Sequence, residues 1–215
     1  SGEGLVLINE LYLEDYLKKE IPSEMPPAYE KEALKAQAVC ARTYAYMQIQ
    51  SNTYREYGAH VDDSTNFQVY NNMGTDARTA AAVEETYGKM LLYEGSPITT
   101  YYFSTSCGTT ADSSVWGSDP ELTPYLKRVT LQPGRRTVNL SSNDDFAAFI
   151  KRMDYPAYDS SFPFYRWNVT VGADVLTANI GGVGNVEALQ VTERGASGVA
   201  QSLLVKGSDG EKVIS

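Results

Sequence analysis

The sequence has few of the residues from which metal and thiol sites are built. Its 215 residues include two cysteines and one histidine. Structural zinc takes four protein ligands and catalytic zinc takes three, mostly Cys, His and carboxylates. Cys40, Cys107 and His60 are far apart in the sequence, and no close ligand spacing links them. We therefore expect no metal site and no bound cofactor.

The sequence also lacks long apolar runs and an excess of positive charge. No stretch approaches the roughly 18 apolar residues that a membrane-spanning helix requires. The formal net charge is −9, which makes nucleic acids and other polyanions poor partners, because like charges repel. At 215 residues the chain can bury a sizeable core. We expect a single domain over residues 1–215, with two closely packed lobes as an alternative.

The two cysteines allow several interpretations. A disulfide between Cys40 and Cys107 would suit an extracytoplasmic protein. Cys40 lies in a predicted helix, where a thiol also serves as a small apolar filler. Cys107 lies in a turn rich in serine and glycine. If His60 reached it, the pair would define a Cys-His amidase or peptidase.

One carboxylate stands in an unusual setting. The run IPSEMPP at residues 21–27 places Glu24 among prolines and apolar side chains. Each proline fixes its φ angle and removes a backbone donor, so the predicted turn has few conformations. No Lys or Arg follows before Lys31, and desolvation is expected to raise the pKa of Glu24, as a general acid requires. The alternative is that Glu24 caps the next helix, since acidic side chains favour helix N-termini.

A helix of small residues is predicted directly after this turn, over residues 29–50. Leu34 and three alanines recur at the spacing of one helical face. Because alanine lets another element approach closely, we expect this helix to be central and buried. Arg42 lies on it and needs a partner if it is buried. That partner is either a carboxylate, in a structural salt bridge, or a ligand.

The whole chain is predicted to be α+β, with helices and antiparallel strands around this central helix and a substrate cleft. A capping box at Ser142 and Asp145 indicates one further helix. Short helices are also expected at 75–87 and 174–179, a hairpin with strands at 89–93 and 98–104, and strands at 167–171, 186–193 and 201–206.

Several segments, in order, resemble one known family. They are NELYLEDYLKKEIPSEMP with PAYEKEALKAQAVCARTYAY after it, DDSTNFQVYNN, YYFSTSCGTTADSSVWG, PYLKRV and VTERGASGVA. Together they span roughly residues 5–205, and the first is long and specific. On these segments the chain resembles the stage II sporulation protein D (SpoIID) family of bacterial cell-wall lytic transglycosylases.

Two features depart from the family pattern. Cys107 stands where the family usually has the first glycine of a Ser-Gly-Gly turn. The family's closing Gly-His-Gly-x-Gly-Met-Ser-Gln segment does not occur before Ser215. Either this chain is a fragment or this member has lost that end, and the start at Ser1 without an initiator Met favours a trimmed chain. Trimming of this kind could also have removed a signal peptide or membrane anchor.

The resemblance implies an activity and its partners. It implies cleavage of the MurNAc-GlcNAc β-1,4 bond in denuded peptidoglycan glycan strands, giving 1,6-anhydro-MurNAc ends, in sporulation or cell-wall remodelling. The partners are then the glycan strands and an amidase that strips their stem peptides, with no nucleic acid, and the location is extracytoplasmic. The alternatives are a non-catalytic glycan-binding module and the Cys-His amidase or peptidase.

The resemblance also implies which residues form the site. Glu24 is the expected catalytic acid and base. Arg42, Tyr125 and Lys127 are expected to line the same groove and bind substrate. Four further residues are candidate hydrogen-bonding groups of the groove, with structural hydrogen bonding as the alternative: Gln68, Tyr70, Ser104 and Ser106.

Overall fold

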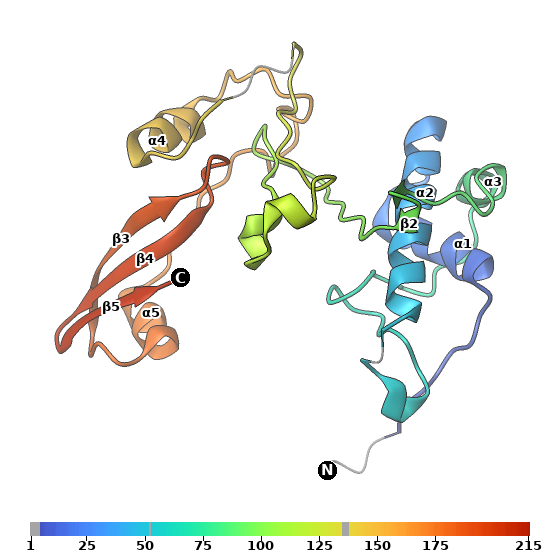
Figure 1. Cartoon of the computed structure of the whole chain (residues 1–215), viewed down its shortest axis with the longest axis horizontal. Coiled ribbons are helices and arrows are strands. Elements are labelled where there is room, and N and C mark those ends of the chain that lie inside the picture. Colours follow the sequence, from blue (N-terminus) through green and yellow to red (C-terminus); the bar gives the residue numbers. More distant parts are fainter. Residues whose placement is uncertain (1–4, 52, 135–137) are drawn as a thin grey trace. The chain divides into compact units, whose positions relative to one another are not determined.

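The computed structural model describes residues 5–51, 53–134 and 138–215. The chain divides into two compact units, Ser1–Tyr102 and Phe103–Ser215. Each unit contains helices and antiparallel strands (Figure 1), which confirms the α+β class. That the two units act as one catalytic domain stays a prediction.

Three helices form the core of the first unit: α1 (Leu13–Glu24), α2 (Lys31–Ile49) and α3 (Ala77–Glu85). Each packs against the other two (Figure 1). The alanine face of α2 is buried at their centre, which confirms the prediction of a central helix of small residues. The buried cluster consists of Leu17, Ile21, Leu34, Ala38, Ala41, Ala82 and Val83.

The end of α1 differs from the predicted turn, because the helix continues through Pro22 to Glu24. A proline inside a helix removes one bond to the carbonyl four residues earlier. The helix nevertheless continues for two residues beyond Pro22, and the N–H of Met25 donates to the Ile21 carbonyl at 2.8 Å. The N-cap of α2 is Glu30. Glu24 therefore ends α1 and does not cap the next helix.

The other local signals of the first unit are partly confirmed. Asp76 caps α3 by accepting from two backbone N–H groups of its first turn. The predicted hairpin is shorter than expected, with β1 (Leu92–Tyr93) paired to β2 (Ser96–Pro97). Glu94 and Gly95 both have positive φ, at 49° and 82°, so the turn takes two residues and the strands pair earlier. Residues 98–104 are not a strand.

The second unit contains a three-stranded antiparallel sheet in the order β3-β4-β5 (Figure 1). Its strands are β3 (Val186–Arg194), β4 (Ala200–Gly207) and β5 (Gly210–Ile214). The first two confirm the strands predicted at 186–193 and 201–206. β5 was missed, and the strand expected at 167–171 is absent from that described segment.

Two helices accompany this sheet in the second unit, α4 (Asn143–Lys151) and α5 (Ala173–Ile180). The Ser142 hydroxyl accepts from the Asp145 N–H at 3.0 Å, which confirms the N-terminal signal of α4. The N-cap of α5 is Gly172, and Asp174 lies in its first turn, so the helix expected at 174–179 is confirmed and begins one residue earlier. The 3₁₀ helices of the chain are η1 (Arg55–Tyr57), η2 (Ser113–Trp116) and η3 (Pro120–Leu122).

Within the described ranges, every helix is too short or too polar to cross a bilayer.

Candidate functional site

Glu24 is held on one side by the backbone of a distant segment. Its carboxylate oxygen Oε1 accepts a hydrogen bond from the Val69 N–H at 2.6 Å. The side chain is half-buried. A backbone donor cannot change its rotamer, so it fixes one carboxylate oxygen in place. The remaining exposure is what a carboxyl group needs in order to exchange a proton with a ligand.

The segment that carries Val69 is attached along α1. The Asn71 N–H donates to the Ser23 hydroxyl at 3.1 Å. The rings of Tyr16 and Tyr70 stack with centroids 5.3 Å apart and planes inclined by 5°. These contacts fix the segment directly after Val69, and with it the donor to Glu24.

A second carboxylate, Glu20, lies one helical turn before Glu24 and is fully buried. Its Oε1 atom accepts from the Gln68 side-chain amide at 3.1 Å and from the Tyr102 hydroxyl at 3.0 Å. Burial, and to a lesser extent the charge of Glu24, raises the pKa of Glu20 to about 8. The hydrogen bonds from Tyr102 and Gln68 oppose this shift. Sequence reasoning missed Glu20, although its i, i+4 spacing to Glu24 was a usable signal.

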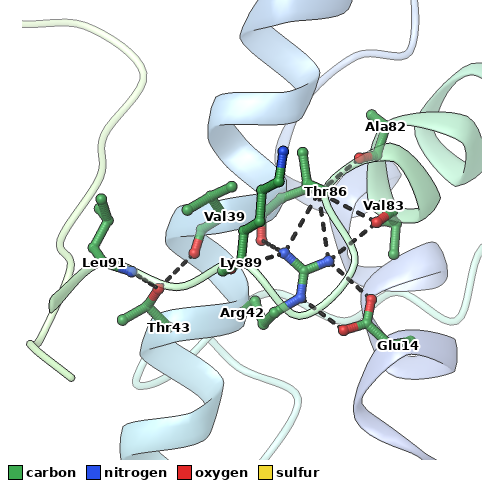
Figure 2. Close-up of polar contacts among 10 residues, drawn as sticks. Glu14, Val39, Arg42, Thr43, Ala82, Val83, Thr86, Lys89 and Leu91 are labelled. Atoms are coloured by element: carbon green, nitrogen blue, oxygen red, sulfur yellow. Dashed lines mark hydrogen bonds and ion pairs between the residues drawn. The ribbon is translucent and has the colours of Figure 1, made fainter. Parts of the chain in front are cut away.

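Arg42 is buried and surrounded by protein groups (Figure 2). It pairs with both oxygens of Glu14, at 2.7 and 2.8 Å. It also donates to the carbonyl oxygens of Val83 and Lys89, each at 3.2 Å, and lies near the Thr86 hydroxyl. The side chain is 1% exposed. This geometry supports the structural salt bridge rather than the ligand-binding alternative.

The structure places the two other expected groove residues of the first unit in the interior or at its edge. Gln68 is 2% exposed and accepts from the Tyr16 hydroxyl at 3.3 Å, besides donating to Glu20 and Tyr102. This is the arrangement of structural hydrogen bonding. Tyr70 is half-buried, and its hydroxyl is a buried polar atom.

A hollow of about 250 Å³ lies beside this network, within the same unit. Tyr102 belongs both to its wall and to the hydrogen bonds around Glu20. Tyr44 and Tyr101 meet edge to face, with centroids 6.4 Å apart. Aromatic faces with nearby amide and hydroxyl groups suit the apolar face and the polar rim of a sugar ring. The lining consists of Tyr44, Thr65, Asn66, Phe67, Thr100, Tyr101 and Tyr102.

The serines expected in the groove belong to the second unit and differ in environment. Ser104 is exposed. Ser106 is buried, and its N–H donates to the Asp159 carboxylate at 2.5 Å. Its hydroxyl accepts from the Gly108 N–H at 2.8 Å. Ser106 therefore shapes its own turn, which is the structural alternative.

Tyr125 and Lys127 also belong to the second unit. Tyr125 is half-buried and Lys127 is exposed. Lys127 lines a hollow of about 190 Å³ together with Asp112, Glu121 and Arg128. A shared groove with Glu24 stays a prediction for both residues.

The thiols and the histidine are divided between the two units, with Cys40 and His60 in the first and Cys107 in the second. Cys40 and Cys107 are free thiols, and His60 is exposed. Burial raises the pKa of the Cys40 thiol, which disfavours the nucleophilic thiolate. In the ranges that the structure describes, no three His, Cys, Asp or Glu side chains are grouped to hold a metal ion. The expected absence of metal stays a prediction.

Comparison with known proteins supports the resemblance. The family model described as SpoIID, stage II sporulation protein, matches residues 1–93, which contain Glu24 and the three helices around Arg42. With the relatives described next, this match assigns residues 1–93 to the stage II sporulation protein D family. The membership connects the chain with sporulation or a related role at the cell wall.

Two relatives come from Bacillus subtilis (strain 168). The stage II sporulation protein D is 33% identical over 191 residues, which cover 81% of this chain and 55% of that protein. The amidase enhancer is 38% identical over 173 residues, covering 79% of this chain and 22% of that protein. An uncharacterised protein of Brachyspira hyodysenteriae is 42% identical over 114 residues, covering 53% and 30%. The chain thus spans between about a fifth and about half of these relatives.

Proposed function

We propose that this chain is the glycan-cleaving part of a peptidoglycan lytic transglycosylase and that Glu24 is its catalytic acid and base. The observation that carries the proposal is a half-buried carboxylate with one oxygen fixed by a backbone N–H at 2.6 Å. Tyr102, which lines the aromatic hollow, accepts a hydrogen bond from Gln68, the residue before Val69. Glu24 also stands at the position of the family's active-site glutamate.

The proposed reaction needs one carboxyl group. Protonated Glu24 donates its proton to the glycosidic oxygen while the bond from that oxygen to the anomeric carbon breaks. Glu24, now a carboxylate, accepts the proton of the muramic acid C6 hydroxyl, whose oxygen bonds to the anomeric carbon. The nucleophile belongs to the same sugar, so proximity is supplied by the substrate. Proton transfer by a positioned group contributes about 10²–10⁴-fold to the rate.

The burial of Glu20 supports this reaction over hydrolysis. A hydrolytic glycosidase generally places two carboxyl groups on either side of the scissile bond. Glu20 is the acid next to Glu24 on the same helical face, but it is fully buried and bonded to protein groups. It cannot flank a sugar from that position. An intramolecular attack does not require it to do so.

The charge of the chain supports a preference for glycan without stem peptides. Stem peptides carry carboxylates, and the chain has a formal net charge of −9. Removal of the peptides takes their carboxylates away and leaves only the lactyl carboxylate of each muramic acid, so an acidic surface repels the strand less. One relative is named an amidase enhancer, and an amidase that removes stem peptides would supply this substrate. Such a partnership, like the substrate itself, implies an extracytoplasmic location.

Mass spectrometry of the products from denuded glycan strands tests the proposal. Anhydro-muramic ends are expected with the wild type and should fall by about 10²–10⁴-fold with Glu24→Gln, which keeps the shape but removes the proton donor. Glu30→Gln, at an exposed glutamate of the same region, is the matched control and should retain activity. Glycan cleavage by Glu24→Gln at the wild-type rate would show that the assignment is wrong.

A second variant separates this function from thiol chemistry. The double substitution Cys40→Ala/Cys107→Ala should retain glycan cleavage, because neither thiol has a role in the proposed reaction. If the double variant loses all glycan cleavage while its circular dichroism is unchanged, a thiol takes part in the reaction and the proposed mechanism is wrong.

A further inference from the structure

The carboxylates of Glu20 and Glu24 lie on one face of α1, one turn apart. The proposed reaction uses only Glu24. Glu20 is fully buried and Glu24 is half-buried. A fully buried carboxyl group beside a catalytic one requires its own explanation, because burying a charge is costly unless it is paired.

The partners of Glu20 are donors to a single oxygen. Gln68 and Tyr102 both donate to Oε1, whereas Oε2 is buried and has no hydrogen-bond partner among the described residues. A carboxylate would leave this second oxygen charged, dry and unpaired. A carboxylic acid carries a proton instead, so no net charge is buried.

The titratable groups around Glu20 are all acids. On α1 they are Glu24 and Tyr16, and Tyr102 donates from the segment after β2. The charges of Tyr70, in the segment along α1, and of Tyr44, on α2, contribute to raising the pKa of Tyr16. Among the described residues, no lysine or arginine acts on the charge of Glu20. An acid with only acids around it keeps its proton more firmly.

Glu20 is also connected to the donor that holds Glu24. Its Oε1 atom accepts from the Gln68 amide at 3.1 Å, and the next residue, Val69, donates its N–H to Glu24 at 2.6 Å. Two consecutive residues of one segment are therefore bound by two consecutive acidic positions of one helical face. A shift of Gln68 would move the Val69 donor with it.

We propose that Glu20 is a positioning residue, an uncharged carboxylic acid that fixes the Gln68–Val69 segment against Glu24 and spares Glu24 a neighbouring negative charge. Its catalytic consequence rests on the proposed function of Glu24, whereas its protonation and its coupling to Glu24 do not. Burial also raises the pKa of Glu20, to about 8, and the charge of Glu24 contributes to that rise. Glu20 is thus uncharged at pH values below about 8.

Carbon-13 NMR titration of the full chain, labelled at the glutamate side-chain carboxyl carbons, tests the protonation directly. One resonance should titrate near pH 8 and should be missing from Glu20→Gln. In Glu24→Gln the same resonance should titrate at lower pH, because the neighbouring negative charge has been removed. A Glu20 resonance that titrates in the ordinary glutamate range, or that does not respond to Glu24→Gln, would overturn the proposal.

Kinetics on denuded glycan test the positioning. Glu20→Gln keeps an uncharged acceptor for Gln68 and Tyr102 and should retain the wild-type kcat. Glu20→Leu removes the acceptor and should lower kcat by up to about 10²-fold with KM unchanged, as expected when a catalytic group is misplaced. Glu30→Leu is the exposed control.

The outcomes separate the two proposals. If wild type yields no anhydro ends, the proposed function fails, and the NMR titration still decides the state of Glu20. If wild type is active and Glu20→Leu, folded by circular dichroism, matches it, the positioning role is refuted. Should Glu20→Leu not fold, loss of kcat in Glu20→Gln would refute that role, because this variant keeps the hydrogen bonds and lacks only the acid.

Discussion

At the scale of single residues, Arg42 shows how a side chain in a family motif can serve the fold. A guanidinium has five N–H donors in a planar fork, which matches a carboxylate on one side and carbonyl groups on the other. The Glu14 carboxylate accepts hydrogen bonds on the first side of Arg42, and the carbonyl oxygens of Val83 and Lys89 accept hydrogen bonds on the second. The position of Arg42, eighteen residues after Glu24, is therefore explained by the packing of three helices.

Loss of this side chain should destabilise the first unit strongly. Arg42→Met leaves Glu14 and two carbonyl groups without their donor, and removal of one partner of a buried pair costs about 3–5 kcal/mol. Arg42→Lys should recover only part of the loss, because an ammonium cannot form the bidentate pair. Urea unfolding measures both variants. Lys31→Met, in an exposed ion pair with Glu85, is the control, and an equal loss there would contradict the argument.

Glu20 should make stability depend on pH in an unusual direction. Its pKa rises from 4.5 to about 8 on folding, so the folded chain holds a proton that the unfolded chain has released between these values. The stabilisation is fully present below pH 4.5 and is lost as the pH rises to about 8.

The expected slope is about −1.4 kcal/mol of unfolding free energy per pH unit across this window. Unfolding by urea at a series of pH values measures it, with wild type compared with Glu20→Gln. The variant has no carboxyl group at this position, and the difference between the two chains should follow the slope. A constant difference from pH 5 to pH 8 would mean that Glu20 is charged in the folded chain.

At the scale of elements, the boundaries of a helix could be predicted from the sequence where local signals mark its ends. The extents of α2 and α3 and the start of α4 were predicted closely, because alanine periodicity and caps such as Asp76 and Ser142 are local signals. The extension of α1 to Glu24 was not, because proline signals a break, and tertiary packing around Ile21 holds the last turn. β5 was missed because its partner across the sheet is not visible in a local pattern.

The cap of α3 has a measurable value. Asp76 accepts from the N–H groups of Arg78 and Thr79, at 2.8 and 3.2 Å. Asp76→Ala should lower the unfolding free energy by about 1 kcal/mol, because two terminal donors lose their acceptor. Asp76→Asn retains the acceptor and should recover most of it. Asp63→Ala, an exposed acid outside any helix, is the control for a general loss of negative charge.

The same contrast applies to the candidate site. The Pro-Met setting and the family motif single out Glu24 from the sequence. They did not reveal that Val69 holds it or that Glu20 lies beneath the same segment, because these contacts join residues 45 and 48 positions apart. Arg42, Gln68 and Ser106 were named as candidates and are bonded within the protein. A motif identifies positions, and packing decides what each position does.

At the scale of the whole molecule, the chain consists of two units with separate cores. The buried cluster around α2 belongs to the first unit. The clusters around Phe149 and Val205 belong to the second. Residues named for the site are divided between them, with Glu24 in the first and Lys127 in the second.

Hydrogen exchange should reveal two sets of amide protons. Arg42→Met should raise the exchange rates of the protected amides in α1, α2 and α3, because their shared ion pair is lost. The amides of β3 and β4 should exchange as in the wild type. Mass spectrometry of peptic fragments separates the two sets. Equal acceleration in both units would show that they unfold as one cooperative body, contrary to the division into two cores.

The bonds of Arg42 also have a consequence for the order in which the chain is made. Its partners extend from Glu14 to Lys89, and the N–H of Leu91 donates to the hydroxyl of the adjacent Thr43 at 3.0 Å. Ribosomes release a chain from its N-terminus, at about 5–20 residues per second. For several seconds after Arg42 is synthesised, the carbonyl groups of residues 83 and 89 do not yet exist to accept its hydrogen bonds. The first unit can complete its folding only when the ribosome has released the nascent chain to about Leu91. That point lies just before the family match ends at residue 93.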